Sequence, residues 1–180
     1  MTRNLPPSAL LVLAPFLLGG CLLVRSTEHR VRLNADGSGD ALLRLIDIRS
    51  DGETDSAVAG DFTLLMGSYD DSTLSSFEDG NRKVIRRQLI TSGDTLTAEV
   101  AYTFTSLEAV EGLRVTEDEI AVLVDPTREI VRTNGSREPL ESGGVRIVWD
   151  RDAARLHFEI RERSLPPSVL LGPFHRRVPR

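Results

Sequence analysis

The sequence predicts a β-rich α+β domain, built mostly as an antiparallel sheet of about seven or eight strands with one or two short helices. Apolar and polar residues alternate with a period of two in several segments, as they do in strands that bury one face. Stretches rich in glycine, asparagine and aspartate separate these segments and supply turns. With 40% hydrophobic and 27% charged residues, the composition indicates one folded domain, not a disordered chain or a multi-span membrane protein.

The strands are expected to form antiparallel hairpins. Alternation begins at His29, and the polar turn at residues 34–40 leads into a return strand. Ser92-Gly93-Asp94 lies between two further strands, and Asn134-Gly135 is a tight-turn signal. The last two strands are expected to pair with each other. The predicted strands cover residues 29–34, 41–48, 84–91, 96–104, 120–124, 129–133, 145–149 and 156–160.

Two short helices and a terminal tail complete the predicted elements. After a polar loop at residues 51–56, the apolar cluster from Phe62 to Tyr69 favours a short helix. Ser106 is a suitable N-cap for a second helix that ends at Leu113, because the apolar residues between them are spaced for one face. From Leu165 onward, four prolines and three arginines among 16 residues predict an extended, partly disordered tail.

The first 20 residues have the order of a secretory signal peptide. Arg3 gives a positive start, residues 9–18 form an apolar run, and Gly19 and Gly20 supply small residues at the cut. The segment Leu18-Gly19-Gly20-Cys21 resembles the bacterial lipobox, in which the cysteine receives a diacylglyceryl thioether and becomes the new N-terminus. The resemblance predicts cleavage between Gly20 and Cys21 and lipidation of Cys21.

Two other interpretations of this leader remain open. An uncleaved signal anchor would use residues 9–24, but these 16 residues contain Pro15 and two glycines and fall short of the roughly 20 that span a bilayer. An ordinary signal peptide would require a chance cysteine, yet Cys21 is the only cysteine in the chain. Lipidation of Cys21 leaves no thiol for a disulfide, so stability must come from packing and hydrogen bonds.

The leader sets the predicted organisation and location of the chain. We expect a signal peptide at residues 1–20, a lipidated N-terminus and short polar tether at 21–27, a globular domain at 28–163 and the tail at 164–180. Leu22 follows the cysteine where some lipoproteins have aspartate, which resembles the pattern sent to the outer membrane in two-membrane bacteria. The expected location is the bacterial cell envelope, lipid-anchored, facing the periplasm or the surface if the source has two membranes.

The charge distribution limits the classes of partner. A net charge of −5 argues against a general nucleic-acid binder. Arg82, Lys83, Arg86 and Arg87 form a basic stripe suited to anionic head groups, although adjacent residues of a strand point to opposite faces. The expected partners are the membrane, through the N-terminal lipid, and an envelope protein, glycan or lipid that the sequence does not identify.

Common catalytic signatures are missing from the sequence. It contains no GxSxG elbow, no P-loop and no dinucleotide fingerprint. His29, His157 and His175 are scattered, without the HExxH spacing of a zinc site. The sequence therefore predicts no catalytic residue, no metal ligand and no cofactor.

Acidic residues offer two weaker candidates for chemistry. Residues 34–40 carry oxygen ligands at alternate positions, but an EF-hand loop starting there needs glutamate at its twelfth position, where Leu45 stands. A hairpin turn is preferred over calcium binding. The carboxylates at residues 117–119, and those of Asp70 and Asp71, are adjacent in sequence and are better explained by solvated loops than by acid–base pairs.

The start of the predicted domain resembles the opening hairpin of LppM-type bacterial lipoprotein domains. The residues that carry this resemblance are Arg30 to Gly39, and the strand from Gly93 to Phe104 followed by Ser106 to Leu113 fits the pattern loosely. The resemblance implies a β-rich α+β domain displayed at the envelope, with no established enzymatic chemistry. Such proteins often carry a C-terminal membrane helix, which this tail lacks.

Two functions of different classes follow. The first is a membrane-anchored envelope lipoprotein with a non-enzymatic binding or structural role. The alternative is an envelope hydrolase whose site is built from scattered Asp, Glu, Arg and His residues. A pocket of converging carboxylates with shifted pKa values would favour the hydrolase, and a shallow sheet face or an exposed apolar groove would favour the binding protein.

Overall fold

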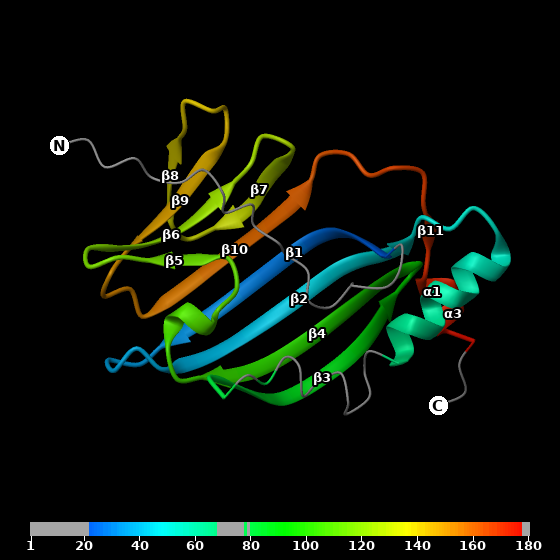
Figure 1. Cartoon of the computed structure of the whole chain (residues 1–180), viewed down its shortest axis with the longest axis horizontal. Helices are drawn as coiled ribbons and strands as arrows, with labels where there is room; N and C mark the ends of the chain where they lie inside the picture. Colours follow the sequence, from blue (N-terminus) through cyan, green and yellow to red (C-terminus); the bar gives the residue numbers. More distant parts are fainter. Residues whose placement is uncertain (1–21, 68–77, 79, 178–180) are drawn as a thin grey trace.

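The computed structural model describes residues 22–67, 78 and 80–177. It is a β-rich α+β fold, as predicted, and its strands form two antiparallel sheets where the sequence predicted one (Figure 1). Three helical segments accompany the sheets: α1 (Asp55–Gly67), the 3-10 turn η1 (Leu107–Ala109) and α3 (Gly172–His175). Sheet A contains β1 (Leu22–Leu33), β2 (Gly39–Ser50), β3 (Arg82–Ser92), β4 (Thr95–Phe104), β7 (Arg128–Thr133), β10 (Arg155–Glu162) and β11 (Val169–Leu170). Sheet B contains β5 (Leu113–Val115), β6 (Glu119–Val124), β8 (Ser136–Pro139) and β9 (Val145–Asp150).

The strands of sheet A follow the order β3-β4-β2-β1-β10-β7, with β11 beside the end of β2. The long central strand β1 pairs on one side with β2 and on the other with β10, which joins the start of the described chain to its last third. In sheet B the order is β5-β6-β9-β8. All the pairs in both sheets are antiparallel.

The inner face of sheet A carries the hydrophobic core. Period-two alternation places Val31, Leu43 and Val100 on this face, and it alternates them with polar residues on the other. At one end of sheet A this face packs against buried residues of sheet B, including Ile147 and Trp149. Burial of each such large side chain contributes about 1.5–3 kcal/mol. The cluster between the two sheets is the larger of the two apolar clusters among the described residues.

The helices cover the other end of the same inner face. Val58 and Leu65 of α1 and Leu171, next to α3, form a second cluster with Leu96 and Ala98 of β4. Sheet B and the helices thus form one broken layer against the inner face. The opposite side of sheet A, called the outer face below, carries the alternate residues of the same strands.

Each of the eight predicted strands corresponds to an observed strand, whereas β5, β8 and β11 were not predicted. The predicted pairing of residues 145–149 with 156–160 is wrong, because β9 lies in sheet B and β10 lies in sheet A. Asn134-Gly135 likewise does not close a hairpin, since β7 and β8 belong to different sheets. The chain passes from sheet A to sheet B at residues 134–135, and it returns to sheet A between β9 and β10.

Asn134 and Gly135 form the corner at which the chain leaves sheet A. The Asn134 Oδ1 atom accepts hydrogen bonds from Trp149 Nε1 at 2.7 Å and from the His157 backbone N–H at 2.8 Å. Its Nδ2 atom donates to the Arg155 carbonyl at 3.0 Å. A Cβ atom at Gly135 would lie 2.6 Å from Trp149 Cε2, so the close approach of the two layers requires glycine.

Three other expectations from the sequence are corrected. The polar tether predicted at residues 21–27 is part of β1 from Leu22 onward, paired with β2 and, from Ser26, with β10. The helix predicted from Ser106 to Leu113 is reduced to η1, because its C-cap residue Val110 is extended. The predicted tail contains β11 and α3, since Leu171 is fully buried and the chain packs back on sheet A.

The predicted signal peptide, the Gly20–Cys21 cleavage bond and the lipidation site Cys21 lie outside the described residues, as do Asp70 and Asp71. The helix predicted at residues 62–69 corresponds to α1, which starts earlier and is described as far as Gly67. Within the described ranges, no helix is long and apolar enough to cross a membrane.

Candidate functional site: a charged row on the outer face of sheet A

Alternate residues of each strand point to the outer face of sheet A, and each of them lies beside its partners on the two neighbouring strands. The side chains of this face therefore form rows that run across the strands. Four residues of β1 define these rows: Ser26, Glu28, Arg30 and Arg32. The row through Glu28 crosses six strands, and we call it the charged row. In strand order it contains Gln88, Glu99, Arg44, Glu28, Glu159 and Arg132.

The carboxylates of this row lie beneath its cations. Glu28, Glu99 and Glu159 are only 2%, 8% and 9% exposed, although they stand in the middle of the outer face. The side chain of Arg132 in this row is 69% exposed, and that of Arg86 in the neighbouring row is 60% exposed. Buried glutamates are rare unless they are paired, so the surrounding cations are required by the fold itself.

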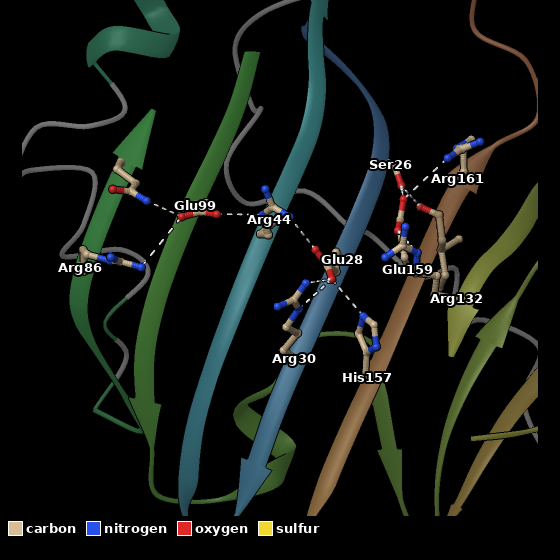
Figure 2. A network of polar contacts seen from close by, with 12 residues as sticks. Ser26, Glu28, Arg30, Arg44, Arg86, Glu99, Arg132, His157, Glu159 and Arg161 are labelled. Carbon is tan, nitrogen blue, oxygen red and sulfur yellow. Dashed lines mark hydrogen bonds and ion pairs between the residues drawn. The ribbon is translucent and has the colours of Figure 1, made fainter. Parts of the chain in front are cut away.

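Glu28 is the most completely paired of the three carboxylates (Figure 2). Its Oε1 atom accepts hydrogen bonds from Arg30 Nε at 2.8 Å and contacts His157 Nε2 at 2.9 Å, and its Oε2 atom accepts one from Arg44 Nη1 at 3.0 Å. Burial would raise the pKa of Glu28, but the hydrogen bonds from these three side chains outweigh it and hold the pKa below its usual value. The carboxylate is therefore ionised at neutral pH.

Arg44 links Glu28 to the next carboxylate along the row. Its Nε atom lies 2.8 Å from Glu99 Oε1, while its Nη1 atom binds Glu28. Glu99 also accepts a hydrogen bond from the Gln88 side-chain amide, and Arg86 Nη2 lies 4.0 Å from its Oε2 atom. One guanidinium thus bridges two buried anions on alternate strands (Figure 2).

Glu159 stands directly opposite Glu28 on the neighbouring strand, an arrangement of like charges that is destabilising unless each charge has its own partners. The Ser26 hydroxyl donates to Glu159 Oε1 at 2.8 Å. The cations nearest to Glu159 are more distant: Arg161 Nη2 lies 3.8 Å from its Oε1 atom, and Arg132 Nε lies 3.9 Å from its Oε2 atom. Glu28 and Glu159 therefore draw on separate groups of basic side chains.

Taken over its four rows, the outer face is basic although the whole chain has a net charge of −5. Eight basic and five acidic side chains occupy the rows, a difference of +3. The basic residues are Arg30, Arg32, Arg44, Lys83, Arg86, Arg132, Arg155 and Arg161, and the acidic residues are Glu28, Asp40, Glu99, Glu129 and Glu159. Because the three central glutamates are buried, the outermost charges are mainly positive.

This arrangement suits the binding of anions better than acid–base chemistry. Guanidinium groups bind phosphate and carboxylate groups through their planar set of donors, and here the buried Glu28 holds those of Arg30 and Arg44 by hydrogen bonds. A general acid needs a raised pKa, whereas the pKa of Glu28 is lowered and its oxygens are already occupied. The side chain of Arg30, in the row beside it, is 53% exposed, so the charged row lies on an open sheet face.

The basic stripe predicted on residues 82–87 is divided between the two faces. Lys83 and Arg86 lie on the outer face, while Arg82 and Arg87 are in register with the inner-face residues Phe104 and Val100. A bulge between Val84 and Arg86 produces this register. The expected divergence of Arg86 and Arg87 is confirmed, and only part of the stripe contributes to the basic face.

The loop at residues 34–40 forms the turn between β1 and β2. Asp36 Oδ1 accepts hydrogen bonds from the backbone N–H and the hydroxyl of Ser38, at 3.0 and 2.6 Å. Ser38 Oγ also accepts one from Asn34 Nδ2 at 3.0 Å. These side chains bond to one another, as in a stable turn. In the part of the chain that the structure describes, no group of three or more His, Cys, Asp or Glu residues is placed to hold a metal ion.

The three histidines occupy separate environments. His157 belongs to the outer face, and His175 Nδ1 lies 2.8 Å from Thr91 Oγ1. His29 is buried on the inner face, where its ring stacks on Phe158 with centroids 4.6 Å apart. Burial lowers the pKa of His29 to about 4, against the opposing effect of Glu28, so the ring is neutral at physiological pH.

Sequence reasoning missed the three buried glutamates. Each lies near the middle of a strand on its polar side, where a charged residue normally indicates a solvated face. The signal that could have found them is a charged residue of either sign within or directly beside four predicted strands: Arg44, Glu99 and Glu159 lie inside their strands, and Glu28 precedes the one expected to begin at His29.

Comparison of the chain with protein-family models, with curated proteins and with solved structures finds no match. The resemblance of residues 30–39 to LppM-type lipoprotein domains and that of residues 18–21 to a lipobox stay predictions.

Replacement of Glu28 by glutamine tests the charged row. The variant removes the charge between Arg30, Arg44 and His157, so we expect the free energy of unfolding to fall by about 2 kcal/mol. The matched control is Glu138→Gln, whose side chain is 48% exposed beside Arg146 and should cost less than about 1 kcal/mol. Urea unfolding of both variants measures the difference, and equal losses would contradict a structural role for the row.

The buried His29 predicts a pH dependence of stability. Its pKa of about 4 in the folded chain lies below the unfolded value of 6.5, so the unfolded chain takes up a proton first as the pH falls. Stability should fall between pH 6.5 and 4 by an amount on the order of 3 kcal/mol. Thermal or urea unfolding of the wild type and of His29→Phe over this range isolates the effect. Parallel pH profiles for the two proteins would disprove it.

Proposed function

We propose that this chain is a lipid-anchored lipoprotein of the bacterial cell envelope with a non-enzymatic binding role. Cys21 carries the lipid, and the outer face of sheet A is the binding surface. The single observation that carries the binding role is the set of buried glutamates in the charged row, of which Glu28 fixes Arg30 and Arg44 by hydrogen bonds, with the exposed Arg86 and Arg132 paired more loosely beside Glu99 and Glu159.

The anchor is supported by the leader, and the position of the first strand determines how closely a lipid would be joined to the fold. The leader has the order of a signal peptide and ends in Leu18-Gly19-Gly20-Cys21. β1 begins at Leu22, where it pairs with Ser50 of β2. A lipid on Cys21 would therefore be joined to the folded sheet without an intervening linker, and two or more acyl chains suffice for stable anchoring.

The binding role is supported by the way the basic side chains are held. Long arginine side chains lose conformational freedom when they bind a ligand, at a cost of about 0.5–1.5 kcal/mol each. Arg30 and Arg44 are already fixed by hydrogen bonds to Glu28. Part of that entropic cost is met in the unbound protein, so the face is suited to bind an anionic partner with little rearrangement.

The hydrolase alternative is less well supported by the same residues. The outer face does bring together Glu28, His157 and Glu159 from distant parts of the chain. Glu28, however, is held ionised by three neighbouring side chains, so it is poorly placed to donate a proton. The open sheet face also offers no enclosure that would exclude water from a reaction.

The anchor is tested by the intact mass of the detergent-extracted full-length product beside a Cys21→Ala variant. We expect the wild type to start at residue 21 with the added mass of acyl chains, and the variant to lack that mass. The wild type should also fractionate with membranes through its lipid. A wild-type product without acyl mass would overturn the proposed anchor.

A further inference from the structure

We propose that the outer face of sheet A docks on the anionic phospholipid head groups of the membrane that holds the anchor. This inference rests on the proposed function, because it takes the lipid on Cys21 as given. It deepens that function by naming the partner class of the same surface.

The outer face has the positive charge that anionic head groups attract. The four rows have a net charge of +3 in a chain with a net charge of −5, so the remaining residues together carry −8 and the outer face is the one whose charge an anionic membrane attracts. Each lysine or arginine near an anionic leaflet contributes about 1 kcal/mol. Among the cations of these rows that form ion pairs, Arg30, Arg86 and Arg132 have the most exposed side chains, at 53%, 60% and 69%.

The outer face is also broad, and the described part of the fold leaves it uncovered. Sheet B and the helices pack on the inner face, as the two apolar clusters show, so among the described residues the bulk of the fold lies on one side of sheet A. With strands of up to 12 residues and six strands side by side, the outer face measures roughly 40 Å by 25 Å. Half-buried apolar residues, Leu42 and Ile46, lie between the charges. Such a mixture of basic and apolar side chains suits the head-group region.

The proposed anchor lies close to the basic rows along the chain. Leu22 is the first residue of β1, and Ser26 of the first row lies only four residues further along the same strand. At about 3.3 Å per residue, the basic rows begin roughly 13 Å from Leu22 and extend to about 33 Å at Arg32. The lipid would hold the face at a high effective concentration above the bilayer, so individually weak contacts suffice.

The membrane is favoured over a phosphorylated glycan by this proximity. A glycan would satisfy the same guanidinium groups, but nothing in the fold places it near the rows. A membrane is brought there by the anchor itself. The binding of a glycan in place of the bilayer is therefore an outcome of the test below.

The test uses the full-length product, extracted from its host membranes in detergent and added to phosphatidylcholine vesicles with or without phosphatidylglycerol. Phenylglyoxal modifies exposed arginines, and peptide mass spectrometry gives the rate at each position. We expect Arg30, Arg86 and Arg132 to react several-fold more slowly on the anionic vesicles, with the protection lost at high salt. The exposed arginines at positions 114, 137 and 151, which lie outside sheet A, should react equally on both vesicles.

A pair of triple variants provides the matched control. Arg30→Gln/Arg86→Gln/Arg132→Gln should abolish the protection of the remaining Arg161, whereas Arg114→Gln/Arg137→Gln/Arg151→Gln should keep it. Circular dichroism and thermal unfolding check that both variants are folded. If the first variant does not fold, the salt dependence of protection in the wild type decides the question.

The possible failures are distinguishable. Protein that does not float with either vesicle type contradicts the lipid anchor and thus the proposed function. Protein that floats with both, but whose Arg30, Arg86 and Arg132 react equally on both, overturns docking while leaving the anchor intact. Protection by a soluble phosphorylated glycan, without protection by anionic vesicles at the same salt concentration, also overturns membrane docking.

Discussion

The bridge from Glu28 through Arg44 to Glu99 is the interaction on which the outer half of the structure depends. A carboxylate that is 2% exposed is tolerated only when cations and hydrogen-bond donors surround it. Arg44 supplies two of the required contacts at 3.0 and 2.8 Å, one to each glutamate. Because the two glutamates lie on β1 and β4, on either side of β2, this one side chain also fixes how the three strands face solvent.

The same alternation that builds the charged row builds the core. On β1, Glu28 and Arg30 face outward while His29 and Val31 face inward, so a slip of one residue would exchange the two sets. Such a slip would bury Arg30 against sheet B and expose Val31. The pairing of β1 with both β2 and β10 is therefore specified from both faces of the sheet.

The sequence predicted the strands well because period-two alternation and turn residues are local signals. It did not predict which strands share a sheet. The segments of β9 and β10 are near neighbours in sequence and still lie in different layers, a division fixed by contacts such as those of Asn134 with Trp149 and His157. The packing of Leu171 against β4 and α1, which turns an expected tail into β11 and α3, is also non-local.

The candidate site was inaccessible to sequence reasoning for a related reason. Ser26 and Glu159 are separated by 133 positions, and Glu28 and His157 by 129, so no local spacing reveals their contacts. Alternation places each residue on the polar side of its strand but does not say that its neighbours bury it. The basic stripe, by contrast, was visible in the sequence, and its two outer-face members belong to the face that the fold assembles.

The orientation of the anchored protein on a bilayer tests the account most directly, and neutron reflectometry of the lipidated chain on a supported membrane measures it. A face that docks flat leaves a protein layer of about 20–25 Å, the thickness of two packed layers. An upright molecule, held by its lipid alone, leaves a layer of about 40 Å, the length of the 12-residue strand β1. We predict the thin layer on membranes that contain phosphatidylglycerol. A thick layer on those membranes would contradict the central claim that the charged row faces the bilayer.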